Sequence, residues 1–113
     1  MIENRASEDG QPSGDELLRS LAALANPHRL RILAALTGRR EYVSELARQL
    51  RISRPLLHMH LQRLEAAGLV TGELELSEDG KAMKYFQAAP FALQLDPASI
   101  AAAVATLSEK DES

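Results

Sequence analysis

The residues with the clearest chemical potential lie on one face of a helix predicted to follow Ser53. Leu57, Leu61 and Leu64 recur at intervals of four and three residues, so they share the buried face of that helix. The side chains expected on the opposite face are Arg54, Pro55, His58, Met59 and Gln62. An arginine can donate two hydrogen bonds to guanine, and a glutamine can bind adenine or a phosphate. The spacing therefore predicts a surface able to recognise the base edges of a nucleic acid.

Charge is distributed unevenly along the 113 residues. The net charge is −3, but residues 26–87 have ten Lys or Arg against seven acids, whereas both flanking segments are acidic. Residues 28–63 contain eight arginines and two glutamates. Such a segment is typical of a surface that binds a polyanion. An ordinary solvated helical face would have the same composition, so charge alone leaves both interpretations open.

Two helices are predicted ahead of this recognition helix, near the start of the chain. Ser13 and Glu16 form a capping box, because each side chain can satisfy a free backbone N–H of the other, and they begin a helix over residues 14–25. The pair at 26–27, Asn then Pro, begins a second helix that runs to Thr37. The stripe expected to face inward in this second helix is Leu30, Leu33, Ala34 and Leu36.

A pair of short helices follows. Tyr42 and Val43 predict a very short strand, and Ser44 is expected to cap the third helix. The apolar face of that helix is Leu46, Ala47 and Leu50. After a tight turn, Ser53 caps the fourth helix, which Gly68 ends. Two capped helices joined by a tight turn suggest a helix-turn-helix, in which the second helix enters the major groove of DNA.

The remainder of the chain changes periodicity twice. From Leu69 the apolar residues alternate, and the Asp-Gly dipeptide at 79–80 predicts a β-hairpin that returns through residues 83–87. Asp and Pro at 96–97 repeat the capping signal and begin a fifth, alanine-rich helix. Its expected apolar side is Ile100, Ala101, Val104 and Leu107. The fold predicted from these elements is mostly α-helical with a small β-hairpin wing, a winged helix-turn-helix.

Three segments resemble the ArsR/SmtB-type family of winged helix-turn-helix repressors. They are LANPHRLRIL at 24–33, SELA at 44–47, and the stretch from SRP at 53–55 to HLQRLEAAGLV at 60–70. The resemblance covers residues 24–87 in order. It implies a homodimer that represses transcription by covering a palindromic operator in double-stranded DNA, with the first and fifth helices packing across the dimer axis.

The resemblance also implies roles for individual residues. Arg54, His58 and Met59 fall on base-facing positions of the family, Gln62 on a position that often holds lysine, and His60 on a framework histidine. The complete set expected to contact DNA is Ser44, Arg51, Ser53, Arg54, His58, Met59, Gln62, Arg63, Lys81 and Lys84. The set expected at the dimer interface is Leu17, Leu18, Leu21, Ile100, Val104 and Leu107.

The sequence departs from the family pattern in three respects. His58 replaces a residue that is usually a small serine, so the operator sequence cannot be transferred from relatives. The hairpin is acidic, with Lys81 and Lys84 as its only cations, which puts the usual contact between wing and phosphate in doubt. Cysteine is absent and the fifth helix has no histidine, so we expect no metal, and we expect no cofactor either.

Several alternatives remain open at this stage. Most of the acids lie in the termini and the wing, away in sequence from the histidines, so an enzyme is disfavoured. The fifth helix either covers the core of the monomer or, as we favour, packs at the dimer interface. The competing function is a winged-helix module that docks a partner protein through the fifth helix. The inducer, if one exists, is a small molecule or a protein.

The expected domain spans residues 14–107, between a disordered arm at 1–13 and an acidic tail at 108–113. We expect a cytoplasmic protein with no membrane partner, because no apolar run approaches the length of a membrane span.

Overall fold

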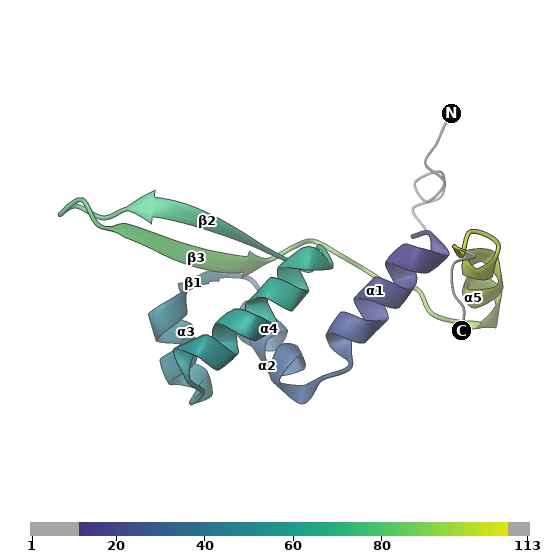
Figure 1. Cartoon of the computed structure of the whole chain (residues 1–113), viewed down its shortest axis with the longest axis horizontal. Coiled ribbons are helices and arrows are strands. Elements are labelled where there is room, and N and C mark those ends of the chain that lie inside the picture. Colours follow the sequence, from purple (N-terminus) through teal and green to yellow (C-terminus); the bar gives the residue numbers. More distant parts are fainter. Residues whose placement is uncertain (1–11, 109–113) are drawn as a thin grey trace. The chain divides into compact units, whose positions relative to one another are not determined.

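The computed structural model describes residues 12–108 of the chain. Its elements are α1 (Gly14–Leu24), α2 (Pro27–Ala35), β1 (Arg40–Tyr42), α3 (Val43–Leu50), α4 (Arg54–Ala66), β2 (Val70–Leu76), β3 (Ala82–Ala88) and α5 (Pro97–Val104) (Figure 1). They form two compact units, one of residues 23–90 and one of the segments before and after it. The arm expected at 1–13 and the tail expected at 108–113 lie almost wholly outside the described residues. Within residues 12–108 no helix is long and apolar enough to cross a membrane.

The core of the unit at 23–90 lies where α2, α3 and α4 meet the base of the sheet. Its fully buried large side chains are Ile32, Leu36, Leu46, Leu57, Leu61, Leu64 and Val70, and Phe86 of β3 belongs to the same cluster. The predicted inward face of α4 is confirmed, since Leu57, Leu61 and Leu64 are each at most 1% exposed. This phase fixes which side of α4 faces solvent.

The predicted inward stripe of α2 is wrong at Leu30 and Ala34, whereas Leu36 is buried as predicted and Leu33 packs against the core. Asn26 caps the helix as expected, because its side chain accepts hydrogen bonds from the backbone N–H groups of His28 and Arg29. However, Leu30 and Ala34 are exposed, and the inward residues are Arg29, Ile32 and Leu36. The apolar pattern misled because a charged residue faces inward, where it has hydrogen-bond acceptors.

The start of α3 also differs from the prediction. The strand β1 ends at Tyr42, and Val43 is already helical, so Val43 does not belong to the strand and Ser44 does not cap the helix. Tyr42 occupies the cap position without a side-chain hydrogen bond to the helix. Pairing of Tyr42 with Tyr85 of β3 fixes where the strand stops, and this long-range contact overrides the local capping preference of Ser44.

Both ends of α4 are as predicted. The Oγ of Ser53 accepts a hydrogen bond from the backbone N–H of Leu56. At the other end Gly68 has a φ of 76°, a left-handed conformation that glycine adopts without strain. The backbone N–H of Leu69 then donates to the carbonyl of Leu64, which closes the last turn.

The sheet is antiparallel with strand order β1-β3-β2. The long hairpin of β2 and β3 extends beyond α3 and α4 as a wing (Figure 1). Its turn spans residues 77–81, and Gly80 has a φ of 86°, as the predicted Asp-Gly turn requires. In the register, Leu74 lies opposite Lys84 and Glu73 lies opposite Tyr85.

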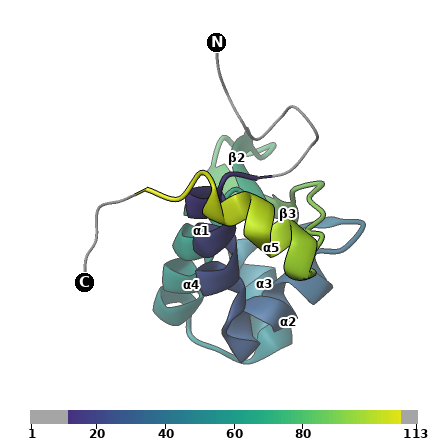
Figure 2. The ribbon, with the colours of Figure 1, turned by 90° about the vertical axis from the view of Figure 1, so that its right-hand side faces the viewer.

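The second unit contains most of α1 together with α5, which lie against each other (Figure 2). The backbone N–H of Gly14 donates to the hydroxyl of Thr106 at 2.8 Å. A Cβ on Gly14 would lie 2.3 Å from the carbonyl oxygen of Ala103, so only glycine permits this approach. The predicted capping box of α1, from Ser13 and Glu16, is present. Asp96 caps α5 as predicted, and it forms a capping box there with Ser99. Leu107 does not belong to α5, which ends at Val104.

Candidate nucleic-acid interface

The outward face of α4 points to solvent. Arg54, His58, Met59 and Gln62 are exposed, because the opposite face of the helix is held in the core. Arg54 is the first residue of the helix, where a long side chain projects past the helix end. None of these four side chains forms a hydrogen bond or an ion pair within residues 12–108. Their donors and acceptors are therefore available to a ligand.

The eight arginines of residues 28–63 separate into three groups. Arg39, Arg40 and Arg48 each form an ion pair, with Glu41, Glu75 and Glu45 respectively. Arg29 is buried. In the described part of the chain, no ion pair or hydrogen bond engages the side chains of the remaining four, which are Arg31, Arg51, Arg54 and Arg63. Three of these four lie on α4 or directly after α3, so unneutralised positive charge concentrates at the helix-turn-helix.

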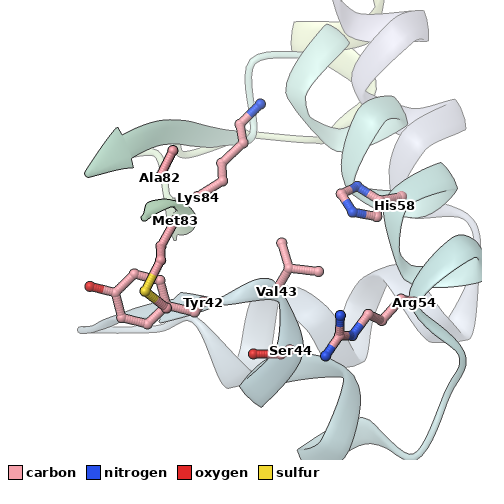
Figure 3. Close-up of a pocket in the computed structure, with 8 residues that line it drawn as sticks. All are labelled: Tyr42, Val43, Ser44, Arg54, His58, Ala82, Met83 and Lys84. Carbon is pink, nitrogen blue, oxygen red and sulfur yellow. The ribbon is translucent and has the colours of Figure 1, made fainter. Parts of the chain in front are cut away.

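A hollow of about 300 Å³ lies between α4, the start of α3 and the wing (Figure 3). Four of the residues expected to contact DNA line it, and these are Ser44, Arg54, His58 and Lys84. Arg54 and His58 approach from α4, and Lys84 comes from β3 (Figure 3). Two cationic groups, a hydroxyl and an imidazole thus line the hollow from three elements, and the Lys84 ammonium lies 5.2 Å from the centre of the Phe86 ring. Such a set can donate hydrogen bonds to a phosphate group.

Sequence reasoning missed the other residues of this hollow. They are Tyr42, Val43, Ala82 and Met83. Only the pairing of β1 with β3 brings Tyr42 beside the wing, and no local pattern signals that contact. The remaining predicted DNA contacts lie outside the hollow but are exposed: Arg51, Ser53, Met59, Gln62, Arg63 and Lys81. Of these, Ser53 already uses its hydroxyl as the cap of α4.

Most acidic side chains of the wing have internal partners. Glu75 accepts hydrogen bonds from the hydroxyl of Tyr42 and from Arg40, and the bond from Tyr42 is the main cause that lowers the pKa of Glu75. Glu73 accepts a hydrogen bond from the hydroxyl of Tyr85 at 2.9 Å. Asp79 accepts from Ser77 and from a backbone N–H, and its pKa is also lowered. Three of the four hairpin acids are therefore used within the hairpin and its neighbouring strand.

The wing also separates its charges by face. Side chains alternate along a strand, and residues opposite each other in the register share a face. Glu73 and Glu75 therefore lie on one face with Tyr85 and Met83, while Lys84 lies on the other face with Leu74. The acidity of the wing, which put its phosphate contact in doubt, is directed away from Lys84.

Behind the exposed face of α4, His60 is anchored by Arg29. The Arg29 guanidinium donates to Nδ1 of His60 at 3.0 Å and to the carbonyl oxygen of Ala23 at 2.6 Å. Since a guanidinium can only donate, Nδ1 must be unprotonated and the histidine neutral. Burial is the main cause that lowers the pKa of His60, and the positive charge of Arg29 adds to it. His60 is thus a hydrogen-bonded framework residue, as expected, and the ring of His28 lies 5.2 Å from its ring.

No group of three or more His, Cys, Asp or Glu side chains within residues 12–108 is placed to hold a metal ion.

The predicted dimer residues differ in exposure. Leu18, Ile100, Val104 and Leu107 are exposed, Leu21 is half-buried, and Leu17 is buried within the single chain.

Known proteins resemble this chain in sequence. Residues 24–73 match the family model of a helix-turn-helix domain. An uncharacterised HTH-type transcriptional regulator of Methanocaldococcus jannaschii is 39% identical over 74 residues, which are 66% of this chain and 77% of that protein. The HTH-type transcriptional repressor SmtB of Mycobacterium tuberculosis is 47% identical over 58 residues, 51% of this chain and 41% of the repressor. The match to SmtB thus spans less than half of that protein.

Solved structures agree with these relatives. A homodimeric winged helix-turn-helix DNA-binding domain from Mycobacterium bovis, described as a possible ArsR-family transcriptional regulator, is 28% identical with a TM-score of 0.55, covering 66% of this chain and 64% of that one. The transcriptional regulator HlyU of Vibrio vulnificus is 28% identical with a TM-score of 0.54, covering 77% and 79%. Members of this group are DNA-binding regulators, not enzymes. The chain belongs to the ArsR/SmtB family of winged helix-turn-helix transcriptional regulators.

Proposed function

We propose that the protein is a homodimeric repressor of the cytoplasm that binds a palindromic operator and places α4 of each protomer in the major groove. The observation that carries this proposal is the exposed face of α4, where the side chains of Arg54, His58, Met59 and Gln62 form no hydrogen bond or ion pair within residues 12–108. A helix of this kind presents its N-terminal residues to base edges. Arg54, as the first residue of α4, is in the position from which arginine contacts guanine.

The remaining predicted contacts bind the backbone of the operator. Arg51 and Arg63 flank the exposed face of α4 without an ion pair in the described chain, and Ser44 and Lys84 line the hollow beside Arg54. A phosphate placed in that hollow would receive hydrogen bonds from α3, α4 and the wing together. Contacts of this type fix the register of the protein on the duplex but carry no sequence information.

The dimer is formed through α1 and α5. Leu18, Ile100 and Val104 are between 45% and 57% exposed in the single chain, and the tight approach at Gly14 keeps α1 and α5 together as one surface. The relative from Mycobacterium bovis is a homodimer. Two recognition helices about 34 Å apart would then match the half-sites of a palindrome.

The first test is selection of a binding sequence from a pool of random duplexes, followed by affinity measurements with Arg54→Ala. We expect an inverted repeat, and we expect Arg54→Ala to lose about 1–3 kcal/mol on that repeat and little on random DNA. Arg31→Ala is the matched control, because Arg31 is also exposed and unpaired in the described chain but lies on α2. Equal loss on both DNAs would assign Arg54 to the phosphate backbone instead.

The dimer is tested by sedimentation of Val104→Glu and Leu21→Glu, with Leu30→Glu as control because Leu30 is exposed on α2. We expect the first two variants to weaken the dimer and the control to leave it intact. Recovery of no preferred sequence, with weak binding at both low and high salt, would favour the competing function of a module that docks a partner protein through α5.

A further inference from the structure

One wall of the hollow beside α4 has no role in the proposed function. The polar wall, whose donors suit a DNA phosphate, consists of Ser44, Arg54, His58 and Lys84. The other wall, which we call the apolar wall, consists of Tyr42, Val43, Ala82 and Met83. A phosphate group has no apolar part, so it would leave the apolar wall in contact with water. A ligand with both an anionic and an apolar part would use both walls.

The apolar wall is held in place from behind. The hydroxyl of Tyr42 donates to Glu75, and the ring of Tyr42 makes an edge contact with the ring of Tyr85, with 5.9 Å between centroids. Val43 is half-buried and packs against the core. Because these contacts already order the wall, a ligand would not have to do so on binding. The half-buried thioether of Met83 can adapt to the shape of a ring and contacts aromatic groups favourably.

The positive charge of the polar wall is available to an anion. None of the eight described residues that line the hollow is acidic. Glu75, which lies opposite Met83 in the sheet, is paired with Arg40. Arg54 forms no hydrogen bond or ion pair within residues 12–108, and its guanidinium points toward the side of Ser44 (Figure 3). An arginine fork beside a hydroxyl matches the two oxygens of a carboxylate.

The size of the hollow limits the ligand further. Its volume of about 300 Å³ is at the lower end of small-molecule sites, which measure about 300–1,000 Å³. A single ring with one charged group suits a site of this size. The ammonium of Lys84 lies over the ring of Phe86, so Arg54 is the cation best placed to hold that charged group.

We infer that the hollow binds a small aromatic carboxylate, and that this ligand is the signal that releases the protein from DNA. The carboxylate lies on Arg54 and Ser44. The ring lies against Tyr42, Val43 and Met83. Since Arg54 is also the residue proposed to contact guanine, ligand and operator compete for it, and the ligand favours the DNA-free protein. This inference rests on the proposed function, to which it adds the signal.

Binding is tested first on the free protein, with benzoate as the probe and with the methionine methyl groups labelled for NMR. The chain has three methionines, of which Met83 lines the hollow and Met59 lies on α4 outside it. Benzoate should shift the Met83 signal in a saturable manner and leave the Met59 signal in place. Benzamide lacks the charge and inorganic phosphate lacks the ring, so each should bind at least about 10-fold more weakly than benzoate.

Two variants with matched controls assign the contacts, and their affinities are measured from the proton signals of benzoate itself. Arg54→Met should weaken benzoate binding about 10-fold, because a charge-assisted pair is lost. Its control is Arg63→Met, since Arg63 is another exposed arginine of α4 that does not line the hollow. Met83→Gln should weaken binding about 3-fold to 10-fold through the loss of an apolar contact, and Met59→Gln is its control.

Release is measured on the inverted repeat selected with the wild-type protein. The ionic strength is held constant, because added salt alone weakens binding to DNA. With benzoate at ten times its dissociation constant, each hollow contributes a factor of about 11, so a dimer should bind the repeat about 100-fold more weakly. Benzamide at the same concentration should have a much smaller effect on the affinity for the repeat.

The outcomes separate this inference from the proposed function. Selection without any preferred sequence would overturn the repressor and, with it, the role of the ligand as a signal. A selected repeat together with an unmoved Met83 signal would overturn the carboxylate site alone and leave the repressor intact. A Met83 shift without release of the repeat would contradict the competition for Arg54. Benzamide or phosphate binding as tightly as benzoate would refute the assigned class of ligand.

Discussion

Replacement of Arg29 by methionine tests whether the buried arginine positions α4. Arg29 is 9% exposed and donates to two buried acceptors, the carbonyl of Ala23 and Nδ1 of His60. Methionine has a similar length and fills most of the volume, so the main change is that both acceptors lose their donor. The substitution therefore isolates the hydrogen bonds from the packing.

The magnitude follows from those two bonds. A buried acceptor left without a partner costs about 1–3 kcal/mol. Against this, methionine avoids the cost of keeping a guanidinium out of water. We expect Arg29→Met to lower the free energy of unfolding by about 2–4 kcal/mol in total. Each kcal/mol shifts the melting temperature of a domain of this size by about 4–8 °C, so the fall should reach at least about 8 °C.

The assay is thermal and urea denaturation followed by circular dichroism, with Arg31→Met as the control. Arg31 lies two residues along the same helix and is exposed, so its loss should change stability by less than about 0.5 kcal/mol. Adding His60→Leu to Arg29→Met should cost less than the sum of the two single changes, because it removes one of the orphaned acceptors. A fall for Arg29→Met as small as that for Arg31→Met would refute the anchoring role.

Three further predictions concern stability. The pKa of His60 is lowered in the folded protein by burial and by the charges of Arg29, His28 and Arg63, so on acidification the unfolded chain takes up the proton first. The urea midpoint of unfolding should therefore fall as the pH drops below about 6.5, the ordinary pKa of histidine. His60→Gln should make this fall less steep. An unchanged slope in His60→Gln would assign the acid sensitivity to other groups. Leu61→Ala should lower the free energy of unfolding by about 2–5 kcal/mol, because Leu61 is 1% exposed and a cavity would remain. Leu74→Ala, at an exposed site, is the control. Equally small changes in stability for both variants would contradict the assigned inward face of α4. Gly72→Ala should lower the free energy of unfolding by about 1–3 kcal/mol, since its Cβ would lie 2.6 Å from Cε1 of Phe86. Adding Phe86→Leu to Gly72→Ala should recover part of that loss. A Gly72→Ala variant as stable as the wild type would show that the ring moves freely.

Local signals predicted most of the fold because they act within a few residues. The caps at Asn26, Ser53 and Asp96 satisfy backbone groups of their own helices, and the turn at Gly80 needs only its own backbone conformation. The leucine spacing of α4 gave the correct inward face, and with it the outward position of Arg54. These features require no knowledge of distant residues.

The predictions were wrong where contacts between residues distant in sequence determine the local structure. Arg29 faces inward because Ala23 and His60 accept its hydrogen bonds, a condition that an apolar pattern does not register. Ser44 lost the cap position because the pairing of Tyr42 with Tyr85 sets the end of β1. For the same reason Arg54 and Lys84 were both predicted to contact DNA, but the hollow that they share with Tyr42 was not predicted.

The shortness of β1 has a mechanical consequence for the wing. Because β1 covers only residues 85–87 of β3, the base of the hairpin is three-stranded and its outer part is a two-stranded ribbon. Two-stranded ribbons twist more than wider sheets. The outer ribbon, which carries Leu74 and Leu76, should therefore twist more strongly than the base, which β1 joins to the rest of the sheet.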